Sequence, residues 1–595
     1  MRIGLLTEGG YPYASGDARL WCDRLVRGLG QHEFDVYALS CSERQEDEGW
    51  VRLPPQVNRV RTAPLWTAVD DGVVHGRRTR RRFTEAYGEL TAALCAGGQA
   101  GGADGTDEIN EVGEATEADR FGNALRALAE LARDEGGLVG ALRSDAAVRT
   151  LEHACRAPGA LRAAGVARVP DLLTVTAHLE RALRPLSLDW YGTDGLGAVD
   201  LCHATAGGAA ALPGLLARHF SGVPLLVTEY EGELRARYLR TGGTPPVRAL
   251  LASFHRRLAA ETYRQAACVT PGGAHVRRWQ ERCGADRARI RTVHPAVEVS
   301  RLDDGGGSAD RADPYTLVRV GPIAPTEDMV SLLRAFGEIR RSVPRARLRI
   351  IGELAEGPAG VDGLRSCEAL AGQLCPGDET RGAHAVDDEP VSFEMMGGPG
   401  VPGLAGACAA GAVVVLPSAA EGFPADLVEV MFRGRATVST DTGAVAEVIG
   451  DTGLVVPPCE PRALARACVT LLRDPERRAR LGAAARARAL ELFTVERNTA
   501  AFRDLYLDTI SRSPARREVL DEAGEPLLFG VPAEALVPWR WTRRPSPPTP
   551  VVPRWAVATA TPSLPATPSL LATSFPPATD RGATPTARRT GEATR

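Results

Sequence analysis

Short apolar segments alternate with amphipathic segments through the second half of the chain, and this alternation restricts the fold more than any other feature. Strand patterns lie at 315–320, 347–351, 391–393, 413–416, 437–439 and 453–456, and helical patterns separate them. Strands that alternate with helices predict a parallel sheet covered by helices on both faces. We therefore expect an α/β fold, with a doubly wound, Rossmann-like domain at about 312–490.

The first half of the chain shows the same alternation with an interruption. Strand patterns at 3–6, 34–39, 198–203 and 224–229 predict one Rossmann-like domain over 1–298. Residues 70–190 interrupt it with helical patterns, and we expect a helical insertion there, with a disordered loop at 97–119 and a solvated helix end at the arginine run 77–82.

The remaining segments are connections and ends. A glycine-rich polar stretch at 303–313 predicts an interdomain linker, and a helical pattern covers 495–511. The last segment, about 540–595, is rich in Pro, Thr and Ala with few apolar residues, which predicts a disordered tail.

Charge and composition exclude several functions. The 595-residue chain has a net charge of −3, which gives no electrostatic case for nucleic acid as a partner. All 71 basic side chains are arginines, so chemistry that needs a Schiff-base or P-loop lysine is excluded. The 12 cysteines form no Cys-x-x-Cys pair, which favours reduced thiols without a metal site. No long apolar run occurs, so we expect no transmembrane segment and a cytoplasmic location.

The segment 416–431 carries the clearest candidate site. A buried strand pattern ends in a polar loop that contains Glu421 and Gly422-Phe423-Pro424, and a helical pattern with Glu429 follows. Ligands of doubly wound sheets bind beyond the carboxyl ends of strands, where two carboxylates can accept hydrogen bonds from vicinal hydroxyls. By spacing alone, an ordinary capped helix explains the two glutamates equally well.

The wider context of this segment resembles a known family. Glu-Gly-Phe-Pro at 421–424, Glu429, the stretch 433–443 and Glu447-Val448-Ile449 resemble the donor-binding region of family 4 glycosyltransferases. The resemblance implies a GT-B fold, two Rossmann-like domains facing a cleft, and a helix at 495–511 that crosses back onto the first domain. It also implies sugar transfer from a nucleotide diphosphate with retention of configuration, without a metal or other cofactor.

The first half resembles one subgroup of that family, the Pel exopolysaccharide glycosyltransferases. The resemblance rests on five short segments: 6–13, Ser15-Gly16 with Trp21, Thr228-Glu229, 234–237 and 278–280. It implies that this domain faces the acceptor, and it suggests a protein partner from an exopolysaccharide system.

The resemblance assigns roles to individual residues. Glu429 would bind the nucleotide ribose, and Glu421 with the backbone of Gly422 and Phe423 would bind the donor sugar. Glu421 and Tyr230 take the catalytic positions, Tyr230 standing where the subgroup has histidine. The expected donor-binding set is Gly16, Asp17, Gly321, Glu421, Gly422, Phe423, Pro424, Leu427 and Glu429.

The diphosphate loop departs from the family pattern. Where the family has arginine and lysine to neutralise the leaving diphosphate, this chain has Pro322 and Glu327, a change of about three charge units. Asp17 similarly replaces a glycine beside the donor. Arg319, Arg433 and Arg435 are nearby candidates for phosphate binding, although each also suits a surface or packing role.

Two functions follow. One is a hexosyltransferase that moves a sugar from a nucleotide diphosphate sugar, UDP-linked by resemblance, to a saccharide or other hydroxyl acceptor. The other is a catalytically degenerate GT-B protein that acts as a scaffold or regulatory partner. The charge facing the diphosphate distinguishes them, because an active enzyme needs an arginine there.

Overall fold

The computed structural model describes residues 1–16, 18–68, 71–97, 107–230, 234, 237–238, 241–298, 313–321, 328–353, 358–375, 389–397, 404–418 and 422–515. All of these residues belong to one compact unit, Met1–Leu536. The linker core at 303–312, the tail at 540–595 and four candidate site residues (Asp17, Pro322, Glu327 and Glu421) lie outside the described residues.

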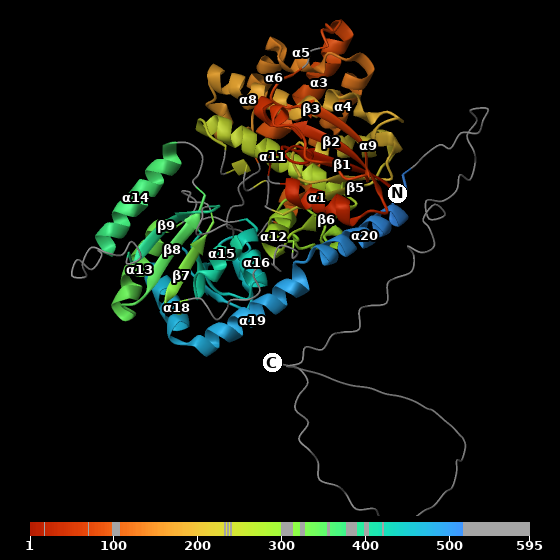
Figure 1. Cartoon of the computed structure of the whole chain (residues 1–595). Helices are drawn as coiled ribbons and strands as arrows, with labels where there is room; N and C mark the ends of the chain where they lie inside the picture. The colour runs from red at the N-terminus through yellow and green to blue at the C-terminus, as the bar shows by residue number, and fades with distance from the viewer. Residues whose placement is uncertain are drawn as a thin grey trace, which may run out of the picture. The chain divides into compact units, whose positions relative to one another are not determined.

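The first domain is built on a parallel sheet of six strands (Figure 1). Its strands are β1 (Arg2–Glu8), β2 (Glu33–Ser40), β3 (Val57–Pro64), β4 (Leu201–Ala204), β5 (Leu225–Glu229) and β6 (Cys268–Pro271), in the order β3-β2-β1-β4-β5-β6. The helices that connect them are α1 (Arg19–Gly28), α2 (Glu43–Asp47), α9 (Ala211–Ser221), α11 (Pro245–Gln265) and α12 (Ala274–Arg282), with the 3₁₀ turn η4 at Arg287–Arg289.

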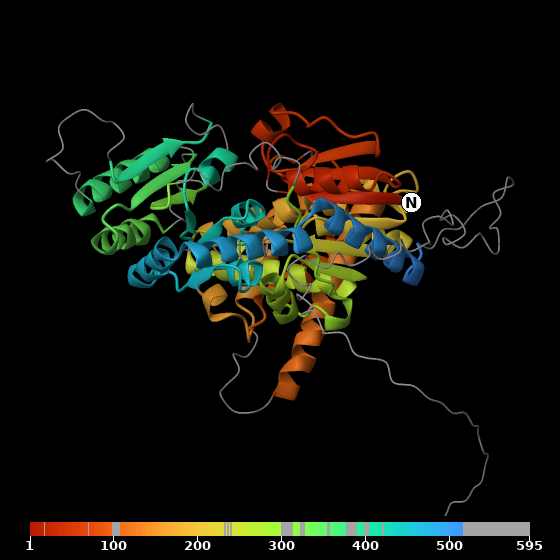
Figure 2. The same cartoon turned by 60° about the horizontal axis from the view of Figure 1, so that its bottom comes forward.

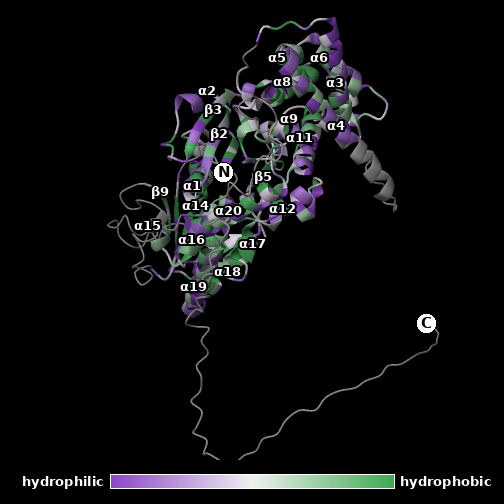
Figure 3. Ribbon diagram, turned by 90° about the vertical axis from the view of Figure 1, so that its right-hand side faces the viewer, coloured by the Kyte–Doolittle hydropathy of each residue, from purple (hydrophilic) through white to green (hydrophobic). Residues whose placement is uncertain are grey.

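Both faces of this sheet are buried. Ile3 and Leu5 of β1 belong to one hydrophobic cluster, whereas Leu6 belongs to another on the opposite face. Successive side chains of a strand point to opposite faces, so two clusters around one strand define a doubly wound sheet. Figure 3 shows hydrophobic residues concentrated on the strands.

A helical segment joins β3 to β4. It comprises α3 (Arg77–Cys95), α4 (Asp107–Glu135), α5 (Leu138–Leu142), α6 (Asp145–Cys155), α7 (Arg162–Gly165), α8 (Val169–Leu183) and the 3₁₀ turns η1 (Arg184–Ser187), η2 (Asp189–Tyr191) and η3 (Leu196–Ala198). The expectation of a loop through residue 119 is wrong, because α4 begins at Asp107. Most glycines of this stretch precede that point, and Asp107 and Glu108 are acidic residues of the kind that favour a helix amino terminus.

The second domain repeats the same strand order. Its sheet contains β7 (Thr316–Val320), β8 (Arg347–Gly352), β9 (Val391–Met395), β10 (Val413–Leu416), β11 (Ala436–Thr440) and β12 (Leu454–Val456), ordered β12-β11-β10-β7-β8-β9. The helices are α13 (Met329–Ser342), α14 (Pro358–Leu374), α15 (Leu404–Ala409), α16 (Ala425–Phe432), α17 (Val445–Ile449), α18 (Pro461–Arg473) and α19 (Pro475–Leu492). Counted from its own first strand, each sheet has the order 3-2-1-4-5-6. The expected α/β class with two doubly wound domains is confirmed.

A last helix, α20 (Val495–Arg512), follows α19 and packs against the first domain (Figure 2). Phe502 and Tyr506 of this helix are fully buried in the cluster that contains Ile3 and Leu5. The Tyr506 hydroxyl lies 2.7 Å from Nδ1 of His203, a buried histidine on β4. The carboxyl end of the described chain therefore completes the core of its first domain.

Two strands, the cysteines and the lengths of the helices complete the description. The sequence patterns missed β3, in which most side chains are half-buried, and β6, which has only four residues. All 12 cysteines are free, and Sγ of Cys95 lies 3.6 Å from Sγ of Cys155. Within the described ranges, no helix is long and apolar enough to cross a membrane.

Candidate functional site

The second sheet has a topological switch point between β7 and β10. These two strands are hydrogen-bonded neighbours, and the chain leads from β7 toward β8 on one side and from β10 toward β11 on the other. The loops beyond their carboxyl ends diverge, and ligands of doubly wound sheets bind where this happens. Gly321 begins one loop and Ser418 lies in the other, so the predicted donor residues flank the switch point.

The loop after β10 is anchored at both ends. The Ser418 amide donates to Oγ1 of Thr440 (2.9 Å), and the same hydroxyl donates to the Ser418 carbonyl (2.7 Å). At the far end of the loop, the Gly422 carbonyl accepts a hydrogen bond from the Ala444 amide (3.1 Å). Both anchors come from the β11 side of the sheet, and they fix where the loop enters α16.

Two predicted donor-site side chains pack inside the protein. Phe423 lies edge-on to Phe493, with ring centroids 5.9 Å apart, and Leu427 is buried in the hydrophobic cluster beneath α16. Pro424 precedes the first helical residue, and its carbonyl accepts from the Val428 amide (3.2 Å). The side chains of Phe423 and Leu427 thus support the described end of the loop from inside the protein.

Glu429 lies on α16 beside an arginine. Its Oε1 is 3.4 Å from Nη2 of Arg433, and the Glu429 side chain remains 28% exposed while that of Arg433 is 11% exposed. Both charges lie close to buried Cys408, whose pKa burial raises to about 12, an effect that Arg433 opposes and Glu429 reinforces. Glu429 is therefore accessible to a ligand, and Arg433 partly neutralises it.

The loop after β7 begins over a buried arginine. Arg319 is 1% exposed, and its guanidinium donates to the Gly321 carbonyl. Gly321 has φ +125°, and a Cβ there would lie 3.0 Å from Oδ2 of Asp426 and 3.6 Å from Nη2 of Arg319. The structure thus brings Arg319, Gly321 and the first turn of α16 together at the switch point. Asp426 is a site residue that the sequence patterns did not single out.

Arg435 lies elsewhere. It immediately precedes β11, so its backbone is at the amino edge of the sheet, opposite the edge where the loops of the switch point emerge. Burial lowers the pKa of Arg435 from its ordinary value. Of the three candidate phosphate-binding arginines, the structure brings Arg319 to the start of the β7 loop and Arg433 to Glu429, and it does not bring Arg435 to the switch point.

Gly16 lies beside the carboxyl end of β1 in the first domain. Its φ is +114°, and a Cβ at this position would overlap the Gly9 carbonyl oxygen. Only glycine suits both the conformation and the close approach. The loop over 9–16 therefore folds back tightly on the strand end.

Tyr230 follows β5 and contacts α20. Its hydroxyl accepts a hydrogen bond from Nδ2 of Asn498 (3.0 Å), and its ring lies edge-on to Trp21 with centroids 5.0 Å apart. Burial raises the pKa of Tyr230. These contacts fix Tyr230 between the first sheet and the last helix and keep its hydroxyl protonated at neutral pH.

The first sheet has its own switch point, between β1 and β4, and a cavity of about 440 Å³ lies there. Its lining comes from the end of β1, from the segments that follow β1, β2, β4 and β5, and from α8 and α11: Glu8, Gly9, Cys41, His178, Ala206, Arg237, Thr241, Gly242, Leu251 and His255. Glu8 and Arg237 lie within two of the segments that carry the subgroup resemblance, but the resemblance assigns them no role. Glu8 is the last residue of β1, and its position at a strand end was the signal that could have identified it, whereas Arg237 lies farther along the connection after β5 and carries no comparable signal.

An ion pair forms the polar centre of this cavity. Nη2 of Arg237 lies 2.9 and 3.0 Å from the two Glu8 carboxylate oxygens, and the Ala210 amide donates to the same carboxylate (3.3 Å). Burial by itself raises the pKa of Glu8, but the Arg237 charge and these hydrogen bonds lower it overall. Burial also lowers the pKa of His255 to about 3 and that of His178 below its ordinary value. At neutral pH the cavity therefore contains an ion pair, in which Glu8 and Arg237 bind each other, and two uncharged imidazoles. These groups can donate hydrogen bonds to hydroxyl groups and accept hydrogen bonds from them.

No group of three or more His, Cys, Asp and Glu side chains suited to a metal ion occurs among the described residues. The polar groups at the second switch point are carboxylates, guanidinium groups and backbone amides, and the first switch point adds neutral imidazoles. These groups can bind hydroxyls and phosphates directly.

Both halves of the chain match family models. Residues 314–474, which contain the second sheet, match the family described as "Glycosyl transferases group 1". Residues 1–288 match the family described as "Domain of unknown function (DUF3492)". The two doubly wound domains define the GT-B architecture, and the group 1 match supports a glycosyltransferase of the family 4 type.

The chain is also similar to individual relatives and solved structures. The D-inositol 3-phosphate glycosyltransferase of Saccharomonospora viridis is 28% identical over 309 residues, which are 50% of this chain and 68% of the relative. That of Kineococcus radiotolerans is 32% identical over 225 residues, 35% of this chain and 49% of the relative. Among solved structures, Anabaena HepE in complex with UDP gives a TM-score of 0.49 at 12% identity, covering 85% of this chain and 100% of that one. The sucrose-phosphate synthase of Thermosynechococcus elongatus gives 0.48 at 15% identity, covering 86% and 100%.

Proposed function

We propose that this protein is a retaining hexosyltransferase, which transfers a sugar from a nucleotide diphosphate sugar, a UDP-sugar by family resemblance, to a saccharide or other hydroxyl acceptor. In this proposal the second domain, 312–490, binds the donor and the first, 1–298, faces the acceptor, while the helix at 495–511 joins them. We place its activity in the cytoplasm, with a protein partner from an exopolysaccharide system.

One observation carries the donor assignment. The loop that ends in Gly422-Phe423-Pro424 and the helix that bears Glu429 adjoin Gly321 at the switch point of the sheet that matches the group 1 family. A carboxylate that is 28% exposed can accept two hydrogen bonds from the ribose hydroxyls. The backbone amides around Gly422 suit the donor sugar and its phosphates, because they lie before the amino end of α16. Glu421 would complete the contacts to the sugar.

The diphosphate position supports a second candidate. Asp426 lies close to Gly321, and Arg319 is buried with its guanidinium hydrogen-bonded to the Gly321 carbonyl. The described residues here therefore offer a diphosphate one carboxylate and one arginine that is already hydrogen-bonded. A charge within about 4 Å of a diphosphate changes its energy by about 4 kcal/mol at an effective dielectric constant of 20. This arrangement favours a protein that binds the nucleoside portion of the donor and does not turn it over, the scaffold alternative.

The cavity around Glu8 and Arg237 supports the acceptor assignment. Its ion pair and neutral histidines offer fixed donors and acceptors without a net charge among the described lining residues. Hydroxyl-rich acceptors match that chemistry. Tyr230 and Gly16 lie in loops of the same domain, and we assign them, with Asp17, to the acceptor-facing side of the donor site.

Calorimetric titration of the full chain with UDP-glucose, UDP-N-acetylglucosamine, GDP-mannose and ADP-glucose tests the proposal. We expect micromolar binding of one of them, at least 10-fold weaker binding by Glu429→Ala, and unchanged binding by Glu85→Ala, which removes an exposed carboxylate from α3. Release of nucleotide from the bound donor, followed by chromatography, then separates the two candidates.

Each outcome has a defined meaning. Binding with turnover establishes the transferase, and binding without turnover in the presence of a panel of saccharide acceptors establishes the scaffold. Failure to bind any of the four donors at millimolar concentration overturns both.

A further inference from the structure

A second cavity lies in the first domain, away from the switch point. It has a volume of about 340 Å³ and lies between α4, α9, α11 and η1. Arg218 and His219 belong to the last turn of α9, and Glu261 and Gln265 to the last turn of α11. Both helices end just before the next strand begins, so this cavity is at the amino edge of the sheet, whereas the Glu8 cavity is at the carboxyl edge.

Leucines form one wall of this cavity. Leu125 of α4, Leu186 of η1 and Leu212, Leu215 and Leu216 of α9 line it. Four of them are at most 4% exposed, and Leu215 is half-buried. The volume falls within the range of about 300–1,000 Å³ typical of small-ligand pockets, which are mostly apolar with a few oriented polar groups.

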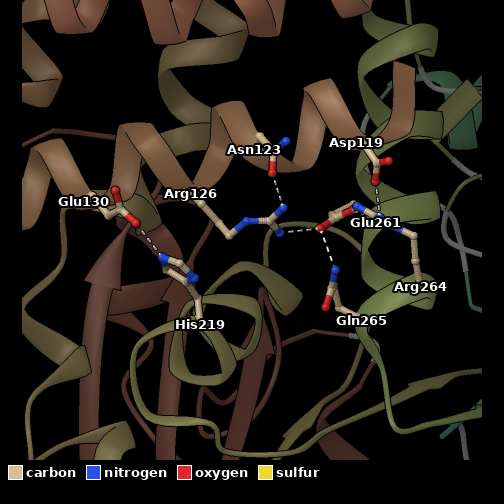
Figure 4. Close-up of polar contacts among 8 residues, drawn as sticks. All are labelled: Asp119, Asn123, Arg126, Glu130, His219, Glu261, Arg264 and Gln265. Carbon is tan, nitrogen blue, oxygen red and sulfur yellow. Dashed lines mark hydrogen bonds and ion pairs between the residues drawn. The ribbon is translucent and has the colours of Figure 1, made fainter. Parts of the chain in front are cut away.

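The other wall of the cavity carries polar side chains, and all but one of them have partners within the described part of the protein. Glu261, which is 3% exposed, accepts from Nη1 of Arg126 (3.1 Å), Nε of Arg264 (2.9 Å) and Nε2 of Gln265 (3.2 Å) (Figure 4). On the other side, Nε2 of His219 lies 2.8 Å from Oε1 of Glu130. These polar groups have partners within the protein, so none of them requires a ligand.

Arg218 is the exception. Its guanidinium lines the cavity and makes no hydrogen bond or ion pair within the described part of the chain. Burial lowers its pKa, and the positive charge of Arg289 lowers it further. A half-buried guanidinium beside a second cation is unfavourable unless an anion joins it.

We propose that this cavity binds an anionic amphiphile, with its carboxylate or phosphate on Arg218 and its hydrocarbon chain against the leucines. A free fatty acid and a phosphorylated lipid-like alcohol share that chemistry. The site is separate from the proposed donor and acceptor sites, and its occupation does not depend on whether the protein transfers a sugar.

Titration of the full chain with sodium octanoate, octyl phosphate and octan-1-ol tests the proposal. We expect at least one of the two anions to bind at least 10-fold more tightly than octan-1-ol. Arg218→Gln should lower the affinity for that anion at least 10-fold, whereas Arg149→Gln, an arginine 79% exposed on α6, should leave it unchanged. Tighter binding of octanoate indicates a fatty acid, and tighter binding of octyl phosphate indicates a phosphorylated alcohol.

A second variant separates binding from folding. Leu215→Trp fills the cavity without removing the charge, and we expect it to abolish anion binding while donor titration gives the wild-type result. Equal binding of octan-1-ol and the anions, unchanged affinity in Arg218→Gln, or failure of both anions to bind at millimolar concentration would each overturn the proposal.

Discussion

His203 is buried without a charge, and its replacement should change how stability depends on pH. The imidazole is 0% exposed on β4, with Nδ1 2.7 Å from the Tyr506 hydroxyl and Nε2 2.7 Å from Oγ1 of Thr228. A neutral imidazole donates with one nitrogen and accepts with the other, and the two hydroxyls can take the complementary roles, so both contacts are satisfied without a charge. Burial lowers the pKa of His203 to about 3.

The sign follows from proton linkage. Because the folded-state pKa lies below the unfolded value of about 6.5, the unfolded chain binds the extra proton between these values. The contribution of His203 to stability is complete above pH 6.5 and falls as the pH decreases, by about 1 kcal/mol for each pH unit. From pH 6.5 to 4.5 the loss is about 2 kcal/mol.

The perturbation is His203→Gln, which keeps a polar side chain and removes the titrating group. At pH 7 the variant should be less stable by about 1–3 kcal/mol, because buried partners lose a hydrogen bond. Urea unfolding of both proteins, followed by circular dichroism at pH 7, 6 and 5, should show this difference shrinking by about 1 kcal/mol per pH unit. Tyr506→Phe, which retains the imidazole, should keep the wild-type slope. A difference between wild type and His203→Gln that stays constant from pH 7 to 5 would refute the reasoning.

Two further substitutions test the second domain. Gly321→Ala should destabilise the protein by about 1–3 kcal/mol, because φ is +125° and the new Cβ would meet Asp426. Gly363→Ala in α14, where a Cβ would meet no other atom, should stabilise the protein slightly, so equal urea midpoints for the two variants would contradict this prediction. Glu447→Ala should cost about 1 kcal/mol in the same assay, because the Glu447 carboxylate accepts from the Ala274 amide (2.8 and 2.6 Å) at the start of α12; an unchanged midpoint would show that this cap contributes nothing.

The fold could be predicted largely because its central strands are buried on both faces. Val413–Leu416 reads as a continuous apolar run, and such runs identify interior parallel strands. The edge strand β3 alternates arginines and asparagine with small apolar residues, so its pattern resembles a loop. The start of α4 was predicted incorrectly for a different reason. The glycines before Asp107 made the acidic residues after it resemble part of the same loop.

The site could be predicted only where it is local in sequence. Glu429 and Gly422 lie within one loop and helix, so their proximity follows from spacing. Glu8 and Arg237 are 229 residues apart, and only the neighbouring positions of β1, β4 and β5 in the sheet bring them together. The approach of Asp426 to Gly321 likewise depends on β10 lying next to β7, which no local pattern encodes.

The position of α20 has a consequence for how the protein is made. A ribosome releases β1 to β6 long before it reaches Phe502 and Tyr506, yet these two side chains fill the same cluster as Ile3 and Leu5. Until the ribosome has passed Arg512, one face of the first sheet presents uncovered apolar surface to chaperones and to other nascent chains. The second domain is synthesised during that interval, so the time needed to synthesise it sets how long the first domain remains unfinished.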